Sequence, residues 1–459
     1  MTGEEQGLFR FLLQVQSKYC PSVTLRIAGG WVRDKLVQGA SNDIDICLNM
    51  MGYPFAEYVN QELEVQGKEK HTIGLIKANP DLNKHLETAS MRIEDTWVDF
   101  VNLRPAEYSL TKEQNIGTPY EDATYRDLTI NSMFYNINED VVEDWTQKGM
   151  VDLRGGVIDT PLPAMRTFCD DPLRVLRAIR FGVRFNFRLS PSVLEAAKDP
   201  EIKRKIGCEI SRERIGKEIQ GMMKGERAHM ALSYIYELDL IDVVFQFPKS
   251  KVFNPEDKIK CFQSALKFNK ISSIEIPEDQ CKMVLLCSFL LPFGRYTYNV
   301  KSKEFLVISH IFLEALKYTK KDSDIAISYF STYFKWAPII KAYKETNTID
   351  RVEVGMLLRE AKKLWIGSLI LGLLVEVEDV EEVISLYHHI QALITSKNLI
   401  GVWDLKPFFD GKQIMEILSL SPSPAIGELL IKEIQWILQN PSHNQDQCKQ
   451  WLLSLPPTH

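Results

Sequence analysis

The 459-residue chain lacks the residue patterns that are typical of disulfide-linked or metal-stabilised proteins. Its eight cysteines are scattered along the sequence, and no two of them form a C-x-x-C pair. Isolated cysteines argue against a disulfide framework or a zinc site, and they favour a reducing compartment. The eight histidines likewise show no spacing typical of metal ligands. Structural metals and disulfides are therefore not expected.

Long hydrophobic stretches and an overall basic charge are also missing. The longest apolar run, 364–375, has about half the length of a membrane span, so it predicts a buried helix and no membrane partner. The start, 1–6, has no basic cluster, which disfavours a secretory or transit peptide. The expected location is intracellular, in the cytoplasm, the nucleus or both, with a mitochondrial pool left open. The net charge of −6 excludes a coat-like nucleic-acid binder, so any such partner needs a local basic surface.

The pattern along the chain predicts an α+β protein of two to four domains. Short β-branched or aromatic runs mark strands in the first third, at 25–28, 44–48, 97–103 and 133–136. From about Pro172 onward, helical periodicity replaces the strand signals. We therefore expect an α/β head followed by three all-helical parts. Their predicted bounds are 1–160 for the head, 161–230 for a neck, 231–350 for a body and 351–459 for a tail.

The first motif combines two glycines with two aspartates. A predicted strand ends in Gly29 and Gly30, and a helix begins directly after them, which allows backbone N–H groups to approach a phosphate closely. Asp43 and Asp45 are two residues apart on the next strand, so their side chains share one face. Two such carboxylates suit a pair of Mg²⁺ ions that activate a hydroxyl and stabilise a leaving pyrophosphate. The alternative is a plain turn followed by a solvated strand end.

The second motif, 124–131, contains a basic–acidic pair ahead of a predicted helix. Arg126 and Asp127 could hold the ribose of a nucleotide, because Asp127 would accept hydrogen bonds from hydroxyls of which a deoxyribose lacks one. The alternative is that Asp127 caps the helix and Arg126 forms a surface ion pair.

The third motif begins with an acid directly before Pro172, which predicts a helix start. Asp171 and Arg174 project from one face of that helix. An acceptor beside a donor matches the edges of cytosine and adenine, whereas uracil and guanine present the reverse order. The alternative is a capped helix with an i,i+3 ion pair. Three apolar residues are expected to face the core: Leu176, Ile179 and Val183.

The neck is basic although the protein is acidic. Between Pro161 and Met230 there are 15 Lys and Arg against 9 Asp and Glu, a local net charge of +6. Such a segment suits contact with an RNA backbone, although a solvated helical face is the alternative. The candidate RNA contacts are Arg180, Arg184 and Arg188.

Four segments together resemble the class II tRNA nucleotidyltransferases, the CCA-adding enzymes of bacteria and eukaryotes. They are G-G-x-V-R-D with D-x-D, R-D-L-T-I-N-S-M-F-Y-N, D-D-P-L-R-V-L-R-A-I-R-F and S-R-E-R-I-G-K-E, and they run from about Ile27 to Glu218. Segments within 79–89 and 98–104 are most similar to the eukaryotic branch. The resemblance implies a polymerase-β-like head with a mixed sheet. It also implies tRNA, CTP and ATP as substrates and Mg²⁺ as cofactor, and it leaves the oligomeric state open.

The resemblance also implies roles for individual residues. Asp43 and Asp45 would bind the metals, and Asp99 on a neighbouring strand is a candidate third carboxylate. The segment 144–149 matches a hinge, and 211–218 matches a helix that supports the nucleotide site. The implied nucleotide-binding residues are Gly29, Gly30 and Arg33 for the triphosphate, Arg126 and Asp127 for the ribose, Asp171 and Arg174 for the base, and Arg177.

Two departures leave the extent of the reaction open. Tyr125 stands where the family has an arginine, and 105–117 looks short and lacks the Ser-Arg-Ile-Pro stretch of eukaryotic relatives. The chain could add all of CCA, only CC or only the terminal A. Two other readings are a bacterial-type poly(A) polymerase and an inactive RNA-binding relative. The mixed charge of the C-terminal half disfavours the first, and the intact aspartate pair disfavours the second.

Overall fold

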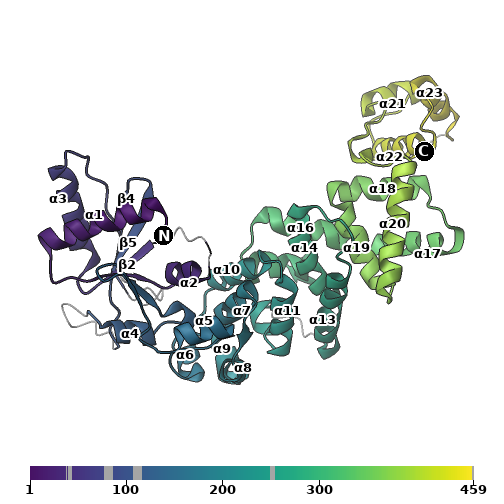
Figure 1. Ribbon diagram of the computed structural model, residues 1–459. Helices are drawn as coiled ribbons and strands as arrows, with labels where there is room; N and C mark the ends of the chain where they lie inside the picture. Colours follow the sequence, from purple (N-terminus) through teal and green to yellow (C-terminus); the bar gives the residue numbers. More distant parts are fainter. Residues whose placement is uncertain (38, 40–43, 77–85, 107–115, 249–253, 457–459) are drawn as a thin grey trace. The chain divides into compact units, whose positions relative to one another are not determined.

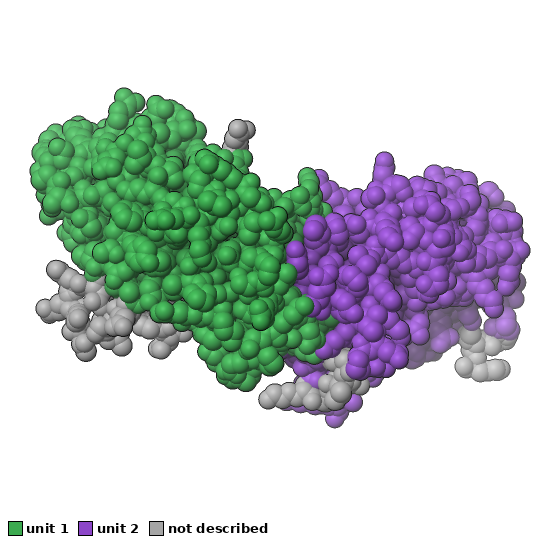
Figure 2. Space-filling view, turned by 60° about the horizontal axis from the view of Figure 1, so that its bottom comes forward, with its two compact units in different colours: residues 1–227, 238–243 green, residues 228–237, 244–459 purple. Residues whose placement is uncertain are grey.

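The structure, a computed structural model, describes residues 1–37, 39, 44–76, 86–106, 116–248 and 254–456. The chain forms two compact units (Figure 2). One consists of residues 1–227 with 238–243, and the other of residues 228–237 with 244–459. The first unit thus holds the predicted head and most of the predicted neck. The finer four-part division remains a prediction.

The first unit is built on a seven-stranded mixed sheet in the order β3-β4-β5-β2-β1-β6-β7. Its strands are β1 (Leu25–Ala28), β2 (Ile44–Leu48), β3 (Gly74–Ile76), β4 (Thr88–Ile93), β5 (Thr96–Asn102), β6 (Phe134–Asn136) and β7 (Val141–Glu143). Strands β2 and β5 pair in parallel, and the other neighbours pair antiparallel. The four strands expected from the sequence correspond to β1, β2, β5 and β6. The predicted fold class is therefore confirmed.

Helices cover this sheet and extend beyond it. They are α1 (Gly3–Tyr19), α2 (Gly30–Leu36), α3 (Gly52–Val65), α4 (Pro119–Thr124), α5 (Gly149–Gly155), α6 (Ala164–Asp170), α7 (Leu173–Phe185), α8 (Pro191–Lys198), α9 (Pro200–Glu209) and α10 (Arg212–Met223). Helix α3 packs on β4 and β5, and α1 packs on α3 (Figure 1). Helix α7 begins directly after Pro172, as predicted, and packs against α10. Its core-facing residues are buried, also as predicted: Leu176, Ile179 and Val183.

The second unit is mostly helical. In chain order the elements are α11 (Ala228–Glu237), α13 (Pro255–Lys270), α14 (Glu278–Phe289), β10 (Thr297–Val300), β11 (Lys303–Leu306), α15 (Val307–His310), α16 (Lys320–Thr332), α17 (Trp336–Thr346), α18 (Arg351–Ala361), α19 (Trp365–Glu376), α20 (Val380–Ser396), α21 (Gly411–Leu418), α22 (Ala425–Gln439) and α23 (Gln445–Ser454). The short helix α12 (Ile241–Val244) belongs to the first unit except for its last residue. The apolar run 364–375 forms the buried helix α19, as expected. Within the described ranges, no helix is long and apolar enough to cross a membrane.

One hairpin, β10–β11, interrupts the helices without having been predicted. Its two-residue turn consists of Lys301 and Ser302, which both have positive φ angles of 46° and 66°. Turns of this kind normally carry Asn-Gly or Asp-Gly, and that signal is missing here.

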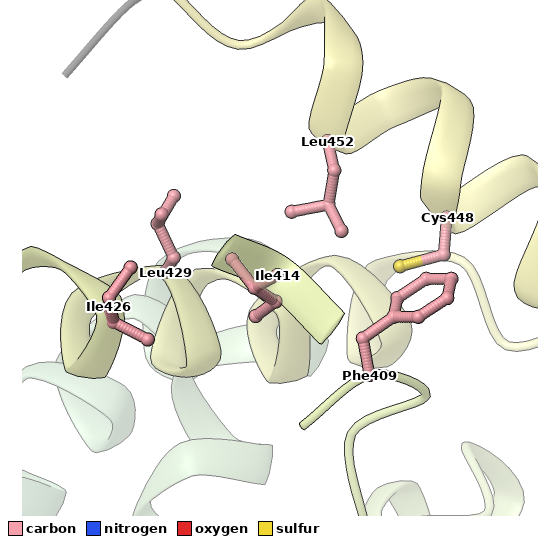
Figure 3. Packing of buried hydrophobic residues seen from close by; sticks show 6 residues of the cluster. All are labelled: Phe409, Ile414, Ile426, Leu429, Cys448 and Leu452. Atoms are coloured by element: carbon pink, nitrogen blue, oxygen red, sulfur yellow. The ribbon is translucent and has the colours of Figure 1, made fainter. Parts of the chain in front are cut away.

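The last three helices enclose a small hydrophobic core of their own (Figure 3). Its buried members are Phe409, Ile414, Ile426, Leu429, Cys448 and Leu452. The fully buried carboxylate of Glu433 on α22 accepts a 3.0 Å hydrogen bond from the backbone N–H of Phe409. Burial raises the pKa of Glu433. Glu433 therefore connects the loop before α21 to α22. Its burial favours the protonated form of its carboxyl group.

Candidate active site

Two of the predicted metal-binding carboxylates lie in register on adjacent parallel strands. Asp45 on β2 is directly opposite Asp99 on β5, and Asp45 is exposed between two buried neighbours. Opposed residues on neighbouring strands lie on the same face of a sheet, at a strand spacing of about 4.8 Å. The hydroxyl of Ser90 donates a hydrogen bond to the Asp99 carboxylate. Sheet pairing thus brings Asp45 and Asp99 together.

Asp43, the other predicted ligand, lies outside the described residues. Among the described residues, no group of three or more His, Cys, Asp or Glu side chains is gathered as metal ligands. The donor set that is present, two carboxylates on one face, fits a hard divalent cation such as Mg²⁺.

The two glycines form the predicted turn between β1 and α2. Gly29 has a φ of +68°, a region that side chains rarely adopt, and its N–H donates to the carbonyl of Met133 at 3.1 Å. A β-carbon at Gly29 would lie 3.1 Å from a guanidinium nitrogen of Arg126. The backbone angle therefore favours glycine, and a larger residue would also displace the Arg126 side chain by a few tenths of an ångström.

Arg33, which was predicted to contact the triphosphate, is a buried side chain with several partners, and that contact stays a prediction. It is only 3% exposed, and its guanidinium donates to Asp34 at 2.8 Å and to the side chain of Asn131. The same guanidinium lies over the rings of Phe181 and Phe185 on α7. Arg33 thus connects α2 to α7 beneath the glycine turn.

A polar cavity of about 770 Å³ contains most of the other predicted residues. The volume is in the range of small-molecule sites. The cationic residues in its lining are Arg104, Arg126, Arg166, Arg174, Arg177, Arg214 and Lys217, and the acidic ones are Asp127, Asp170, Asp171 and Glu218. Seven cations against four acids favour a polyanionic ligand. The sequence motifs predicted Arg126, Asp127, Asp171, Arg174 and Arg177 for this place.

Asp127 is 8% exposed and already carries several hydrogen bonds. It accepts from Arg177 Nε at 2.7 Å, from the side-chain amide of Asn131 at 3.1 Å and from the backbone N–H of Leu128 at 2.9 Å. Burial alone would raise the pKa of Asp127, but the Arg177 charge and these donors hold that pKa well below its usual range. Asp127 is therefore a fixed negative charge in the cavity wall.

Arg126 pairs with a buried acid instead of forming the surface ion pair considered as an alternative. Its Nη2 donates to Asp122 at 3.2 Å, and the Asp122 side chain is fully buried. The guanidinium also lies over the ring of Phe134, within 3.7 Å of the Cys47 sulfur. Burial raises the pKa of Cys47 to about 12, so this thiol stays neutral beside the arginine.

Asp171 and Arg174 do not pair with each other, although an i,i+3 ion pair was one alternative. Asp171 accepts from Arg214 Nη2 at 2.6 Å and from the backbone N–H of Leu173 at 3.2 Å. Arg174 Nη2 donates to the backbone carbonyl of Tyr125 at 2.8 Å. Separate anchors therefore hold an acceptor and a donor on the wall of one cavity.

The three arginines predicted to contact RNA differ in their surroundings. Arg180 Nε donates to Glu218 at 2.6 Å, and its guanidinium lies over Phe181. The Arg184 side chain is 48% exposed and lies 3.3 Å from Asp34, and Arg188 at the start of a short strand is exposed. Arg184 and Arg188 are thus the more accessible of the three.

Four cavity-lining cations were not singled out as site residues from the sequence: Arg104, Arg166, Arg214 and Lys217. Arg214 and Lys217 lie in the 211–218 motif that was assigned only a supporting role. No sequence signal distinguished Arg166 from an ordinary surface arginine.

Comparison with known proteins agrees with this geometry. Residues 25–159 match the family described as the poly A polymerase head domain. Together with the cavity and the carboxylate pair, this match defines a nucleotidyltransferase head. The mitochondrial CCA tRNA nucleotidyltransferase of Candida glabrata is 34% identical, with 95% of this chain and 91% of that protein covered. For tRNA nucleotidyltransferase cca2 of Schizosaccharomyces pombe, the identity is 33% and the coverage is 96% and 95%.

The chain therefore belongs to the CCA tRNA nucleotidyltransferase family. The solved structure of the Thermotoga maritima CCA-adding enzyme complexed with tRNA shares its fold, with a TM-score of 0.65 at 20% identity. That alignment covers 99% of this chain and 96% of the other. Nucleotidyltransferases of this family use divalent metal ions.

Proposed function

We propose that this protein adds nucleotides from CTP and ATP to the 3′ end of tRNA without a nucleic-acid template. The observation that carries this proposal is the cationic cavity, which presents Asp171 and Arg174 from separate anchors on its wall. The protein itself supplies the base-reading groups, and family membership identifies the acceptor as tRNA.

In the reaction, the 3′ hydroxyl of tRNA attacks the α-phosphorus of the triphosphate. The new O–P bond forms as the bond to the β-phosphate breaks, and pyrophosphate leaves. The cofactor is proposed to be Mg²⁺, held by Asp45, Asp43 and Asp99, and when bound it favours the deprotonated hydroxyl and offsets charge on the leaving group. The cationic cavity wall attracts the triphosphate.

Base choice rests on hydrogen-bond order. Asp171 accepts a hydrogen bond from the exocyclic amino group of cytosine or adenine, and Arg174 donates one to the adjacent ring nitrogen. Uracil and guanine offer an acceptor to Asp171 and a donor to Arg174, so both contacts become repulsive.

Arg126 and Asp127 are proposed to contact the ribose. Because every strong acceptor position of Asp127 is engaged, this contact requires Arg177 or Asn131 to yield one bond.

Addition of the complete CCA is the primary proposal, since full-length relatives carry that name. Addition of CC alone is the second candidate. The observation that favours it is Tyr125, which stands where the family has an arginine and whose hydroxyl is bonded to Arg166 in the cavity. The shortened segment 105–117 was the other reason, but most of it lies outside the described residues.

The experiment uses three tRNA substrates, one lacking all of CCA, one lacking only the final A and one complete. Each is incubated with CTP, with ATP and with both, and the product lengths are resolved. Extension of the first substrate by three nucleotides ending in A supports full addition, and arrest after the second C supports the restricted reading. Absence of any extension on the first two substrates contradicts both.

The metal site is tested in the same assay with Asp45→Ala and Asp43→Ala. Asp95→Ala, at an exposed turn of the same sheet, is the matched control and should behave as wild type. The site variants should fall below about a hundredth of wild-type incorporation, a barrier change of ~2.7 kcal/mol, with tRNA affinity nearly unchanged. Higher residual activity would count against metal ligation.

We also propose a cellular location for this protein, based on the name of a relative. One full-length relative is named a mitochondrial enzyme, so we propose that mitochondria hold part of this protein beside a pool in the cytoplasm or nucleus. Fractionation with an antibody to the native chain tests this distribution. A mitochondrial fraction free of the protein would contradict it.

A further inference from the structure

The cations of the cavity divide into three groups by what they contact. Three are paired with carboxylates: Arg126 with Asp122, Arg177 with Asp127, and Arg214 with Asp171. Arg104 and Arg174 share the backbone carbonyl of Tyr125 as acceptor, at 3.2 and 2.8 Å. Across the described parts of the chain, no carboxylate pairs with the remaining two, Arg166 and Lys217. Arg166 and Lys217 therefore have neither a paired carboxylate nor a share in that carbonyl.

Arg166 is held in place by a neutral partner. Its Nη2 donates to the Tyr125 hydroxyl at 3.0 Å, and its guanidinium lies 5.6 Å from the centre of the Tyr125 ring. A phenol and an aromatic face orient a guanidinium without cancelling its charge. Of the five N–H donors of Arg166, one is used by the hydroxyl, so the others remain for a ligand.

Tyr125 also connects this arginine to the base-reading group. Its side chain holds Arg166, and its backbone carbonyl accepts from Arg174. Removing the hydroxyl should loosen Arg166 alone, because the carbonyl that anchors Arg174 is unaffected. Substrate affinity and base choice can therefore be separated experimentally.

We propose that Arg166, positioned by Tyr125, binds a phosphate group in the cavity. An exposed, oriented and uncompensated guanidinium is suited to bidentate hydrogen bonding with phosphate oxygens. Two phosphates of the reaction share this chemistry, one on the nucleoside triphosphate and one at the 3′ end of the RNA. The inference rests on the proposed function, which supplies both ligands, and it adds a residue that the sequence motifs did not indicate.

The test compares Arg166→Gln, Arg166→Lys and Tyr125→Phe with Arg154→Gln. Arg154 is an exposed arginine on α5 that lies outside the cavity lining, so its substitution removes the same charge from the same unit. Values of KM and kcat are measured separately for CTP and for tRNA lacking CCA, and CTP is compared with UTP for base choice. Thermal unfolding of each variant shows whether the fold is intact.

Arg166→Gln should raise one KM about tenfold, equivalent to about 1.4 kcal/mol, with kcat near that of Arg154→Gln. Arg166→Lys should recover part of the loss, and Tyr125→Phe should raise the same KM by a smaller factor. Preference for CTP over UTP should not change. A rise in the KM for CTP identifies the triphosphate, and a rise in the KM for tRNA identifies the RNA phosphate.

Equal KM values for Arg166→Gln and Arg154→Gln, for both substrates, would overturn the inference. If the wild-type protein transfers no nucleotide, equilibrium binding of CTP and of tRNA replaces the kinetic assay. Binding that is weakened by Arg166→Gln would then support the phosphate site although the proposed function had failed. Binding that is unaffected by the substitution would refute the site.

Discussion

The hydrogen bond between Arg214 and Asp171 should control how well the enzyme distinguishes cytosine from uracil. Arg214 Nη2 lies 2.6 Å from Asp171 Oδ2, and it is the charged partner that fixes the orientation of this carboxylate. The Arg214→Gln variant removes the charge and shortens the side chain. Asp171 then keeps only the 3.2 Å hydrogen bond from Leu173 N–H, so it samples orientations in which its acceptor is misplaced.

The expected loss in kcat/KM for CTP can be derived from the solvent exposure of Arg214 and Asp171. Hydrogen bonds to charged groups contribute roughly 1.5–3 kcal/mol. The two side chains are 19% and 31% exposed, and water screens them in part, so the lower end of that range applies. About 1.5 kcal/mol corresponds to roughly a tenfold loss in kcat/KM for CTP. The reaction with UTP, which cannot use the Asp171 acceptor, should change little.

The assay measures kcat/KM for CTP and UTP on tRNA lacking CCA. Arg204→Gln is the matched control, because Arg204 forms a 2.7 Å ion pair with Glu201 on the exposed surface of α9. The Arg204→Gln substitution should change kcat/KM neither for CTP nor for UTP. Arg214→Lys, which retains a charge, should fall between wild type and Arg214→Gln. If CTP and UTP were affected by the same factor, Arg214 would stabilise the fold without orienting Asp171, and the reasoning would be refuted.

Three further predictions concern stability and RNA binding. Gly52→Ala places a β-carbon 2.1 Å from a carbonyl oxygen of β5, and urea unfolding should show a loss of about 1–3 kcal/mol. Gly7→Ala, which meets no atom within 4 Å on α1, should instead gain about 0.5–1 kcal/mol, so equal effects would contradict the packing argument. Burial raises the pKa of Glu433, so its contribution to stability is complete below the unfolded carboxyl pKa of about 4.3 and is lost as pH rises through the folded pKa. Calorimetry should therefore show Glu433→Gln melting higher than wild type at pH 7 but not near pH 4, and coincident curves at pH 7 would disprove this. Joint replacement of Arg184 and Arg188 by glutamine should reduce the slope of log tRNA affinity against log salt by about 0.9 per lost contact, whereas an unchanged slope would place the RNA elsewhere.

The sequence by itself determined the features that depend on a few neighbouring residues. The turn at Gly29 and Gly30 was predictable because glycine readily adopts the positive backbone angle found at Gly29. The start of α7 after Pro172 was predictable because proline favours the first turn of a helix. The apolar run of α19 was long enough to indicate a buried helix and too short for a membrane span.

Only the tertiary structure decided which side chains meet. The opposition of Asp45 and Asp99 depends on the pairing of β2 with β5, and the residue pattern of one strand does not specify which strand lies beside it. Arg33 carries a conspicuous motif yet is buried, because α7 places two aromatic rings against it. Arg166 belongs to no recognised motif, yet it lies in the cavity. There it contacts Tyr125, which follows the end of α4 and is 41 residues away in sequence. Local chemistry fixes turns and helix ends, whereas the partner of each charge is set by contacts between segments far apart in the chain.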